Sequence, residues 1–241
     1  IYEKFDKKAI FEGGEEHELT GFSFVAQCNF DDARGRKSLR VVSCNTTALC
    51  RVLNSLDKAF KIKRARAVIT RRAADPDETS KGPIDAVVLD PVNLPSHHGQ
   101  DVQTVLPHID IVTMALKVPT THMHLHSLIV SVKEKASEDK VIDVLKGTTR
   151  VLLIDSKEGI KSTAHVTDLA RELGRPRSDL YEVAVWGDSI KVIDDEIYFY
   201  MGVHQEAIVT PENIDAIRAL MGGYSKEESI KLTNKMLGIV K

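Results

Sequence analysis

A cysteine stands where a strand-like segment meets a helix-like segment. The run SLRVV, residues 38–42, has the composition of a strand, and SCNTT directly after it opens a helical pattern. A thiol at a helix start feels the positive end of the helix dipole and the unpaired N–H groups there, which lower its pKa and stabilise the thiolate. Ser43, Asn45 and Thr46 add donors, so Cys44 is a candidate nucleophile. The alternative is a small buried residue without chemistry.

Three histidines alternate with apolar residues in THMHLHSLIVSV, residues 121–132. A period of two predicts a strand that carries all three on one face, namely His122, His124 and His126. One imidazole could serve the candidate thiol as a general base, or an HxH pair could bind zinc. The third interpretation is a polar sheet face with no chemistry. Alternation alone does not decide which histidine matters.

Two pairs of polar side chains lie near the two ends of a long loop-rich segment, residues 71–101. Arg71 and Arg72 follow a predicted strand, and His97 and His98 precede a glycine. Arginine forks bind phosphate through two hydrogen bonds, and histidines and glycines in loops often complete such a pocket. Each pair alone fits a solvated loop. Together they predict an anionic substrate, with room for two phosphate positions.

The predicted elements mix strands and helices, and they must position these side chains. Strands are expected at 8–11, 38–42, 64–70, 109–117, 121–132 and 151–154, and an antiparallel meander at 182–186, 190–193 and 196–203. Helices are expected at 46–59, 138–146, 163–173, from 211 onward, and at 226–237. Ser137, Thr210 and Ser225 are expected N-caps, the last in a capping box with Glu228. Because strict βαβ alternation is missing, the predicted fold class is α+β.

The composition bounds the classes of function. The chain has 241 residues, of which 42% are hydrophobic, enough for one large core or two modest ones. The formal net charge is −2 and no basic stripe occurs, so nucleic acid is not an expected partner. We find no transmembrane run and no signal peptide, and expect no membrane partner. Cys28, Cys44 and Cys50 lack CxxC spacing, which predicts no disulfide framework and a cytoplasmic protein.

Several longer stretches occur together in one order. They are RVV followed by SCNTT, then RRAADPDE, NLPSHHG, VPTTHMHLH, AVWGDSI and VHQEAIVTPENIDAIRA. On these motifs the chain resembles the archaeal-type, phosphorylating glyceraldehyde-3-phosphate dehydrogenases over essentially its whole length. The resemblance implies a nucleotide-binding Rossmann half, followed by a catalytic half with a mixed, mostly antiparallel sheet and helices.

The resemblance also implies a domain organisation. No GxGxxG-like turn occurs, and roughly the first hundred residues expected of such an enzyme are absent, so we expect a piece of a longer protein. Residues 1–41 would be the C-terminal remnant of the nucleotide-binding domain, and 42–224 the catalytic domain. Residues 225–241 would form a last helix that folds back against the nucleotide-binding part.

Carried over residue by residue, the resemblance assigns Cys44 as the nucleophile and His124 as the catalytic base. It assigns substrate or phosphate binding to Ser43, Asn45, Thr46, Arg71, His97 and His98. It assigns cofactor contacts to Gly14, Arg72 and Gln205, with NAD or NADP as the cofactor. The implied reaction is the glycolytic oxidation of D-glyceraldehyde 3-phosphate, with inorganic phosphate, to 1,3-bisphosphoglycerate. The implied assembly is a homotetramer whose catalytic halves pack face to face.

Three other functions stay open at this point. A metal-dependent hydrolase could use His122, His124 and the 97–98 pair, although no aspartate stands in a recognisable motif. A non-catalytic fragment could act as an oligomerisation module. Another acylating semialdehyde dehydrogenase would share the thiol chemistry, but the arginine and histidine pairs favour a phosphorylated substrate.

Overall fold

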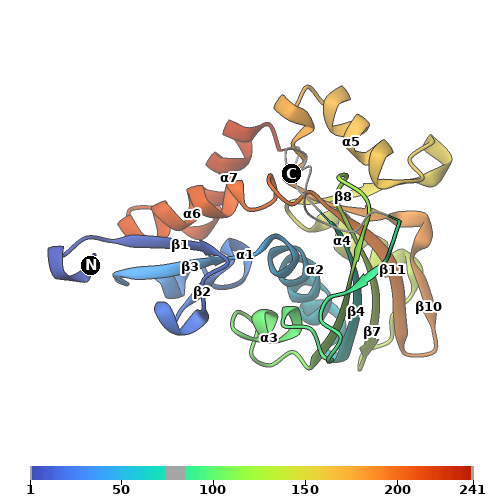
Figure 1. Cartoon of the computed structure of the whole chain (residues 1–241), viewed down its shortest axis with the longest axis horizontal. Helices are drawn as coiled ribbons and strands as arrows, with labels where there is room; N and C mark the ends of the chain where they lie inside the picture. Colours follow the sequence, from blue (N-terminus) through green and yellow to red (C-terminus); the bar gives the residue numbers. More distant parts are fainter. Residues whose placement is uncertain (1, 74–84, 240–241) are drawn as a thin grey trace.

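Two β-sheets of different character lie side by side in the computed structural model, which describes residues 2–73 and 85–239 (Figure 1). The RRAADPDE motif beyond Ala73 lies outside the described residues. The smaller sheet has the order β1-β3-β2, and both of its pairings are parallel. Its strands are β1 (Ala9–Gly13), β2 (Ser23–Phe24) and β3 (Ser38–Val42).

The larger sheet has eight strands in the order β5-β6-β4-β7-β11-β9-β8, with β10 paired to β11. They are β4 (Ile62–Arg72), β5 (Val88–Leu89), β6 (Ile111–Val118), β7 (His124–Val132), β8 (Val151–Ile154), β9 (Val183–Trp186), β10 (Lys191–Ile193) and β11 (Glu196–Val203). The pairs β4–β6 and β8–β9 are parallel, and the other pairings are antiparallel. A mixed, mostly antiparallel sheet with helices confirms the α+β class.

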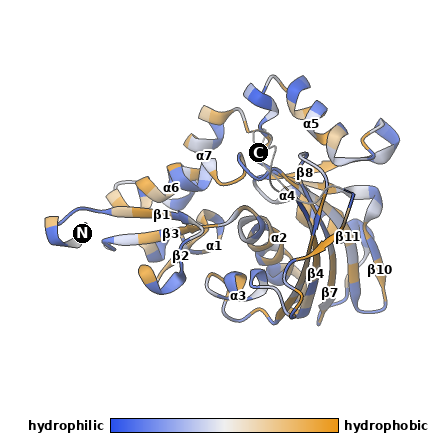
Figure 2. Cartoon of the chain, viewed as in Figure 1, coloured by the Kyte–Doolittle hydropathy of each residue, from blue (hydrophilic) through white to orange (hydrophobic). Residues whose placement is uncertain are grey.

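Three helices cover one face of the larger sheet: α2 (Cys44–Phe60), α3 (His98–Gln103) and α4 (Glu138–Gly147). Leu49, Leu53 and Leu56 project from α2 at helical spacing into the core that holds Ile69 and Leu128 of the sheet. Each such leucine stabilises the fold by about 1.5–3 kcal/mol relative to an exposed one. The apolar residues alternate along the strands (Figure 2), so every second side chain faces α2.

The smaller sheet packs against helices from the other end of the chain. These are α6 (Thr210–Met221) and α7 (Lys226–Leu237), with the short α1 (Ala26–Asn29) beside them, while α5 (Thr163–Glu172) packs on β8 and β9 (Figure 1). Ile230 of α7 joins a core with Phe24 and Leu39. The last helix therefore packs against the smaller sheet. Among the described residues, no helix has the length and apolarity needed to cross a membrane.

A buried ionic cluster ties α2 to α6. Arg51 donates to Glu212 at 2.6 Å, and Arg150 donates to Glu212 at 3.0 Å and to Asp215 at 2.6 Å. All four side chains are fully buried. Burial opposes ionisation of Glu212, but the two arginines outweigh it and keep its pKa below the usual value. The helix that begins with Cys44 is thus fixed against the helix that covers the smaller sheet.

Local capping signals were read correctly at two helices. The Ser137 hydroxyl accepts the N–H of Lys140 at the start of α4, and Ser225 and Glu228 form the expected capping box of α7. Thr210 is not the predicted cap, because it is already helical and Val209 occupies the N-cap position. The predicted meander is also wrong in its pairing, because β9 and β10 both pair with β11.

Candidate active site

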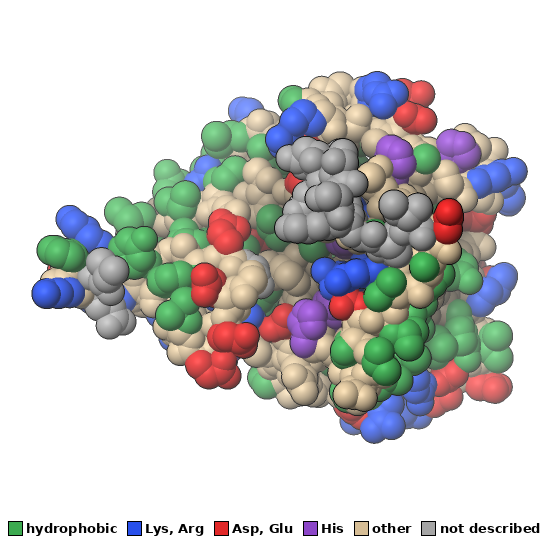
Figure 3. Space-filling view, viewed as in Figure 1, with side chains coloured by type: hydrophobic (Ala, Val, Ile, Leu, Met, Phe, Trp, Pro, Cys, Tyr) green, Lys and Arg blue, Asp and Glu red, His purple; other side chains and the backbone are tan. Residues whose placement is uncertain are grey.

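Cys44 is the first residue of α2 and follows directly after β3 and the N-cap residue Ser43. The Ser43 hydroxyl accepts the N–H of Thr46 at 3.4 Å, which fixes the first helical turn. Cys44 is half-buried and lines a cavity of about 430 Å³ near the carboxyl ends of β1, β3 and β4. In the space-filling view a histidine and basic side chains meet at the junction of the two parts (Figure 3).

Most of the side chains expected to bind substrate or cofactor meet in this cavity. Its lining comprises Glu12, Gly14, Val42, Ser43, Cys44, Asn45, Arg71, His97, His98, Gln205 and Val209. Two expected residues are absent from this lining. Thr46 is fully buried in the helix, and Arg72 is buried with its Nε donating to Gln205 Oε1 at 3.0 Å.

The thiol of Cys44 is protonated at neutral pH in this structure. Burial raises its pKa to about 11, while the N–H of Asn45 and the charges of Arg71 and Arg72 lower it by less. The prediction of a lowered pKa is therefore wrong, because desolvation of the sulfur outweighs the helix terminus. The cysteine needs a proton acceptor or an added positive charge before it can react as a thiolate.

His124 is the first residue of β7 and is fully buried on the face that meets α2. Its Nδ1 accepts the backbone N–H of Arg72 at 3.0 Å, so the neutral ring carries its proton on Nε2. That Nε2 has no hydrogen-bond partner among the described residues. Burial, then the charges of Arg71 and Arg72, lowers the His124 pKa to about 3. His124 does not line the cavity itself and is connected to it through Arg72 and Gln205.

The prediction of three histidines on one face is wrong. Strand β7 begins at His124, because Met123 has a positive φ of 51° that interrupts the extended chain. His122 is exposed and its backbone N–H donates to Thr120 Oγ1 at 3.2 Å. Only His124 and His126 share the buried face. Geometry thus separates His122 from the candidate thiol.

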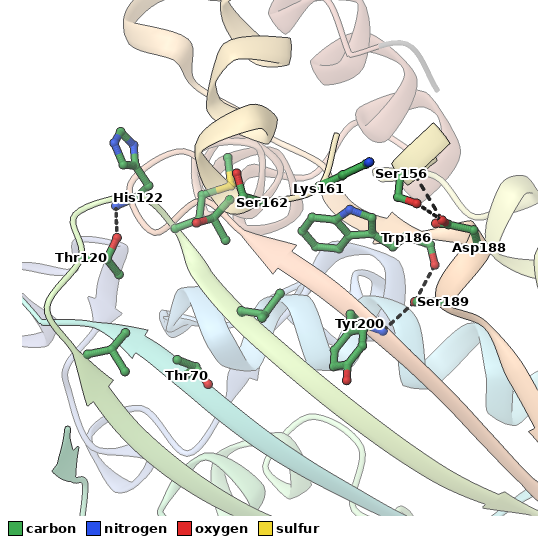
Figure 4. A pocket seen from close by; sticks show the side chains of 14 residues that line it. Thr70, Thr120, His122, Ser156, Lys161, Ser162, Trp186, Asp188, Ser189 and Tyr200 are labelled. Atoms are coloured by element: carbon green, nitrogen blue, oxygen red, sulfur yellow. Dashed lines mark hydrogen bonds between the residues drawn. The ribbon is translucent and has the colours of Figure 1, made fainter. Parts of the chain in front are cut away.

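His122 instead lines a second cavity, of about 680 Å³, on the opposite face of the larger sheet (Figure 4). Thr70 and Tyr200 lie on the sheet below it, and Trp186 stands over it. Leu125 of β7 also lines this cavity. Thr70 and Leu125 alternate with the inward-facing residues of β4 and β7, so the sheet separates the two cavities. No cysteine lines this larger cavity, so we assign the chemistry to the smaller one.

Arg71 lines the Cys44 cavity with a partly exposed side chain. Its Nη1 forms an ion pair with Asp90, but its Nε is buried and has no hydrogen-bond partner among the described residues. A bound anion would add charge-assisted hydrogen bonds to the exposed part of this side chain. Arg72 is already engaged, because its Nη2 pairs with Glu206. Asp90 was not predicted as a partner, since it lies in a loop without a periodic pattern.

His97 and His98 stack with 4.0 Å between ring centroids and an interplanar angle of 27°. His97 is exposed, whereas His98 is buried and contacts Ser96 Oγ at 3.2 Å and Asn45 Nδ2 at 3.4 Å. Burial, then the proximity of His97 and Arg71, lowers the His98 pKa to about 3. The buried ring is therefore neutral, and the exposed ring is the one open to an incoming ligand.

The alternative of a metal centre has no geometric support in the part of the chain that the structure describes. Within residues 2–73 and 85–239, no three His, Cys, Asp or Glu side chains converge to hold a metal ion. His124 and His126 are instead hydrogen-bonded to Arg72 and Asn45, respectively.

Comparisons with known proteins extend this picture. The family described as "Glyceraldehyde 3-phosphate dehydrogenase, C-terminal domain" matches residues 43–189. A glyceraldehyde-3-phosphate dehydrogenase of Methanoregula boonei is 53% identical over all of this chain and 70% of its own length. Proteins of the same name from Methanobrevibacter smithii and Sulfurisphaera tokodaii are 52% and 49% identical, each over all of this chain and 71% of their own length.

Proposed function

Because the chain belongs to the glyceraldehyde-3-phosphate dehydrogenase family, in its archaeal type, we propose that it oxidises D-glyceraldehyde 3-phosphate to 1,3-bisphosphoglycerate. The oxidation uses NAD or NADP and consumes inorganic phosphate. The observation that supports the proposal is that Cys44 and the cationic side chain of Arg71 line one cavity. A nucleophile beside an anion donor suits a phosphorylated aldehyde.

The cavity offers donors of the kind that two phosphate groups require. Arg71 contributes its guanidinium and His97 an exposed imidazole, while Ser43 and Asn45 add short polar side chains beside the sulfur. Arginine binds phosphate oxygens through paired, charge-assisted hydrogen bonds. This set favours a phosphorylated substrate over the plain semialdehyde of a related acylating dehydrogenase.

The residues of this cavity also fit a dinucleotide. Ligands of parallel sheets bind beyond the carboxyl ends of the strands, and the cavity lies at the ends of β1 and β3. A side-chain atom added at Gly14 would meet nothing within 4 Å, so a ligand can approach the backbone there. Gln205 lines the same space, and Arg72 holds its amide oxygen. When bound, the nicotinamide ring supplies the hydride acceptor.

Cys44 performs the covalent steps. Its sulfur forms a bond to the aldehyde carbon, and the resulting hemithioacetal is oxidised to a thioester while His124 takes the hydroxyl proton. A phosphate oxygen then attacks the thioester carbon, the C–S bond breaks, and the sulfur leaves as a thiolate. To take a proton at Nε2, the His124 ring must carry its other proton on Nδ1, so the bond from the Arg72 N–H is given up during turnover.

Binding of phosphate would adjust the base. The positive charge of Arg71 is one reason for the low pKa of His124, after burial itself. An anion on Arg71 offsets that charge and raises the His124 pKa towards neutrality, where a general base works best. The same anion also offsets the Arg71 charge that lowers the pKa of Cys44. The His124 imidazole therefore has to serve as the proton acceptor.

We extend the proposal to domains and assembly. Residues 1–41 carry the parallel sheet of a nucleotide-binding part, 42–224 form the catalytic part, and 225–241 hold the last helix. The outer face of the larger sheet exposes Val68, Val112, Met114 and Tyr200. Hydrophobic side chains gather on the half of the molecule that holds the larger sheet (Figure 3). This supports face-to-face packing of the larger sheets in a homotetramer.

The test is NAD(P)H formation from D-glyceraldehyde 3-phosphate, followed at 340 nm with and without inorganic phosphate. We expect sustained turnover only with phosphate, and none in Cys44→Ser, because an alcohol is a far weaker nucleophile at neutral pH. Turnover that does not depend on phosphate, or that prefers an unphosphorylated aldehyde, would favour a different acylating dehydrogenase.

A further inference from the structure

His126 and Asn45 are in contact behind the Cys44 cavity. The Nε2 of His126 lies 2.8 Å from Oδ1 of Asn45, and both side chains are buried. The His126 ring projects from β7 on the face that meets α2, and Asn45 is the second residue of α2. This contact therefore joins the sheet to the first turn of the helix that carries the nucleophile.

The direction of this hydrogen bond is fixed by chemistry. A carboxamide oxygen can only accept, so Nε2 of His126 is the donor. Burial lowers the His126 pKa to about 3, the ring is neutral, and its Nδ1 carries no proton. That Nδ1 is buried and has no hydrogen-bond partner among the described residues.

The remaining bonds run in one direction from Asn45. Its Nδ2 donates to Nε2 of His98 at 3.4 Å, which leaves the proton of that ring on Nδ1. His98 Nδ1 then donates to Ser96 Oγ at 3.2 Å, and Ser96 Oγ donates to Thr113 Oγ1 at 2.8 Å. This series of hydrogen bonds ends on a backbone carbonyl, because Thr113 Oγ1 donates to the carbonyl oxygen of Ser96 at 3.0 Å.

We propose that His126 is a positioning residue, whose Nε2–H holds the Asn45 carboxamide so that its NH₂ group, and not its oxygen, serves the cavity beside Cys44. One Asn45 N–H is used by His98, and the other is available to an oxygen that gains negative charge on the carbon bound to Cys44. The inference rests on the proposed function. It also makes His98 a member of the buried polar relay, by which we mean the hydrogen bonds from His126 through Asn45, His98 and Ser96 to Thr113. The exposed His97 is left to bind phosphate.

The kinetic test follows acylation of Cys44 by 1,3-bisphosphoglycerate, the reverse of the last chemical step, which needs no nicotinamide. Sulfur attacks the acyl carbon and inorganic phosphate leaves. His126→Leu should lower the limiting acylation rate by about 10- to 100-fold, with an unchanged half-saturating concentration, because a misdirected oxyanion donor costs up to 10²–10³ in rate. His126→Gln keeps an N–H donor and should restore most of the rate. His122→Leu, the same change on the opposite face, is the matched control.

Coupling to Asn45 separates positioning from packing. In an Asn45→Ala background, His126→Leu should have no further effect on the acylation rate. Equal losses in the His126→Leu and His126→Gln variants, or a loss that persists without the Asn45 amide, would show that the imidazole acts only by packing and would overturn the inference.

A spectroscopic test needs no variant to fold. In ¹⁵N-histidine spectra of the unsubstituted protein, His126 should be the Nε2–H tautomer and His98 the Nδ1–H tautomer. The opposite tautomer at His126 overturns the inference even if Cys44 is acylated normally. Failure of the unsubstituted protein to acylate at all, with these tautomers observed, would instead refute the proposed function.

Discussion

Alkylation of Cys44 by iodoacetamide should be slow at neutral pH and should accelerate steadily towards pH 10. With a pKa of about 11, the Cys44 thiol is ionised to about 3 × 10⁻⁴ at pH 7.5, against about one tenth for an ordinary cysteine. The difference of about 300-fold is partly offset, because a more basic thiolate is about 10-fold more nucleophilic. The net expectation is a rate about 30-fold below that of a free thiol.

The assay is the rate of carbamidomethylation between pH 6 and 10.5, read by mass spectrometry of the peptide that contains residue 44. Peptide mapping separates this site from Cys28, whose pKa is raised to about 12. Fragment-ion spectra separate it from Cys50, whose pKa burial raises well above the usual value and which shares the tryptic peptide 41–51. A plateau with an inflection at or below pH 8.5 would refute the reasoning. It would mean that the helix terminus and the arginines outweigh burial of the sulfur.

Three further predictions concern stability, proton transfer and anion binding. Glu212→Gln should lower the free energy of unfolding by about 3–5 kcal/mol in urea, because it leaves the buried Arg51 without a carboxylate partner and Arg150 with Asp215 alone. The exposed Glu227→Gln should change it by less than about 0.5 kcal/mol. A loss below about 1 kcal/mol in the Glu212 variant would contradict the stabilising role of the cluster. The pKa of Glu212 is lower in the folded protein than in the unfolded chain. The stability that the Glu212 carboxylate contributes is therefore present above the unfolded pKa of about 4.3 and is lost as the pH falls below it. The difference in stability between the variant and the parent should narrow in that acidic range. His124→Gln keeps a hydrogen-bond donor but no base, so turnover should fall by about 10²- to 10⁴-fold, as in His124→Ala. The control variant His122→Ala should keep the parent activity. Substantial activity in His124→Gln would show that His124 acts only as a hydrogen-bond donor. Arg71→Gln should raise the KM for inorganic phosphate or for the substrate by about 10- to 100-fold, because a charge-assisted hydrogen bond is lost. An unchanged KM for both would show that Arg71 does not belong to the anion site.

Elements with strong local signals were predictable from the sequence. Strand β3 and strand β8 have the expected bounds, and α7 begins and ends where Ser225 and the apolar spacing place it. The reason is that capping and periodicity act between residues a few positions apart. The α+β class followed from the same signals, and the cavity brings together Cys44 with most of the expected side chains.

Features set by tertiary contacts were not predictable. The alternation of THMHLH placed His122 with its neighbours, because nothing in the sequence shows that Met123 takes a positive φ. The helix start suggested a low pKa for Cys44, but burial of the sulfur depends on side chains brought in from distant segments. The partner of Arg71, Asp90, lies in a loop whose path a pattern cannot specify.

The buried polar relay shows the same limit. Asn45 was expected beside the substrate carbon by resemblance, yet its partners His126 and His98 lie on two other segments of the chain. Their roles depend on which nitrogen carries a proton, and that is decided by geometry within hydrogen-bonding distance. Sequence spacing predicted which residue types would be near the thiol and left their hydrogen-bond directions open.

Mass spectrometry of the protein after exposure to 1,3-bisphosphoglycerate tests the central claim most directly. We predict one phosphoglyceroyl group on the peptide that contains Cys44, released by inorganic phosphate and missing in Cys44→Ser. An acyl group on Cys28 or Cys50 instead, or no acyl group on a correctly folded protein, would contradict the account.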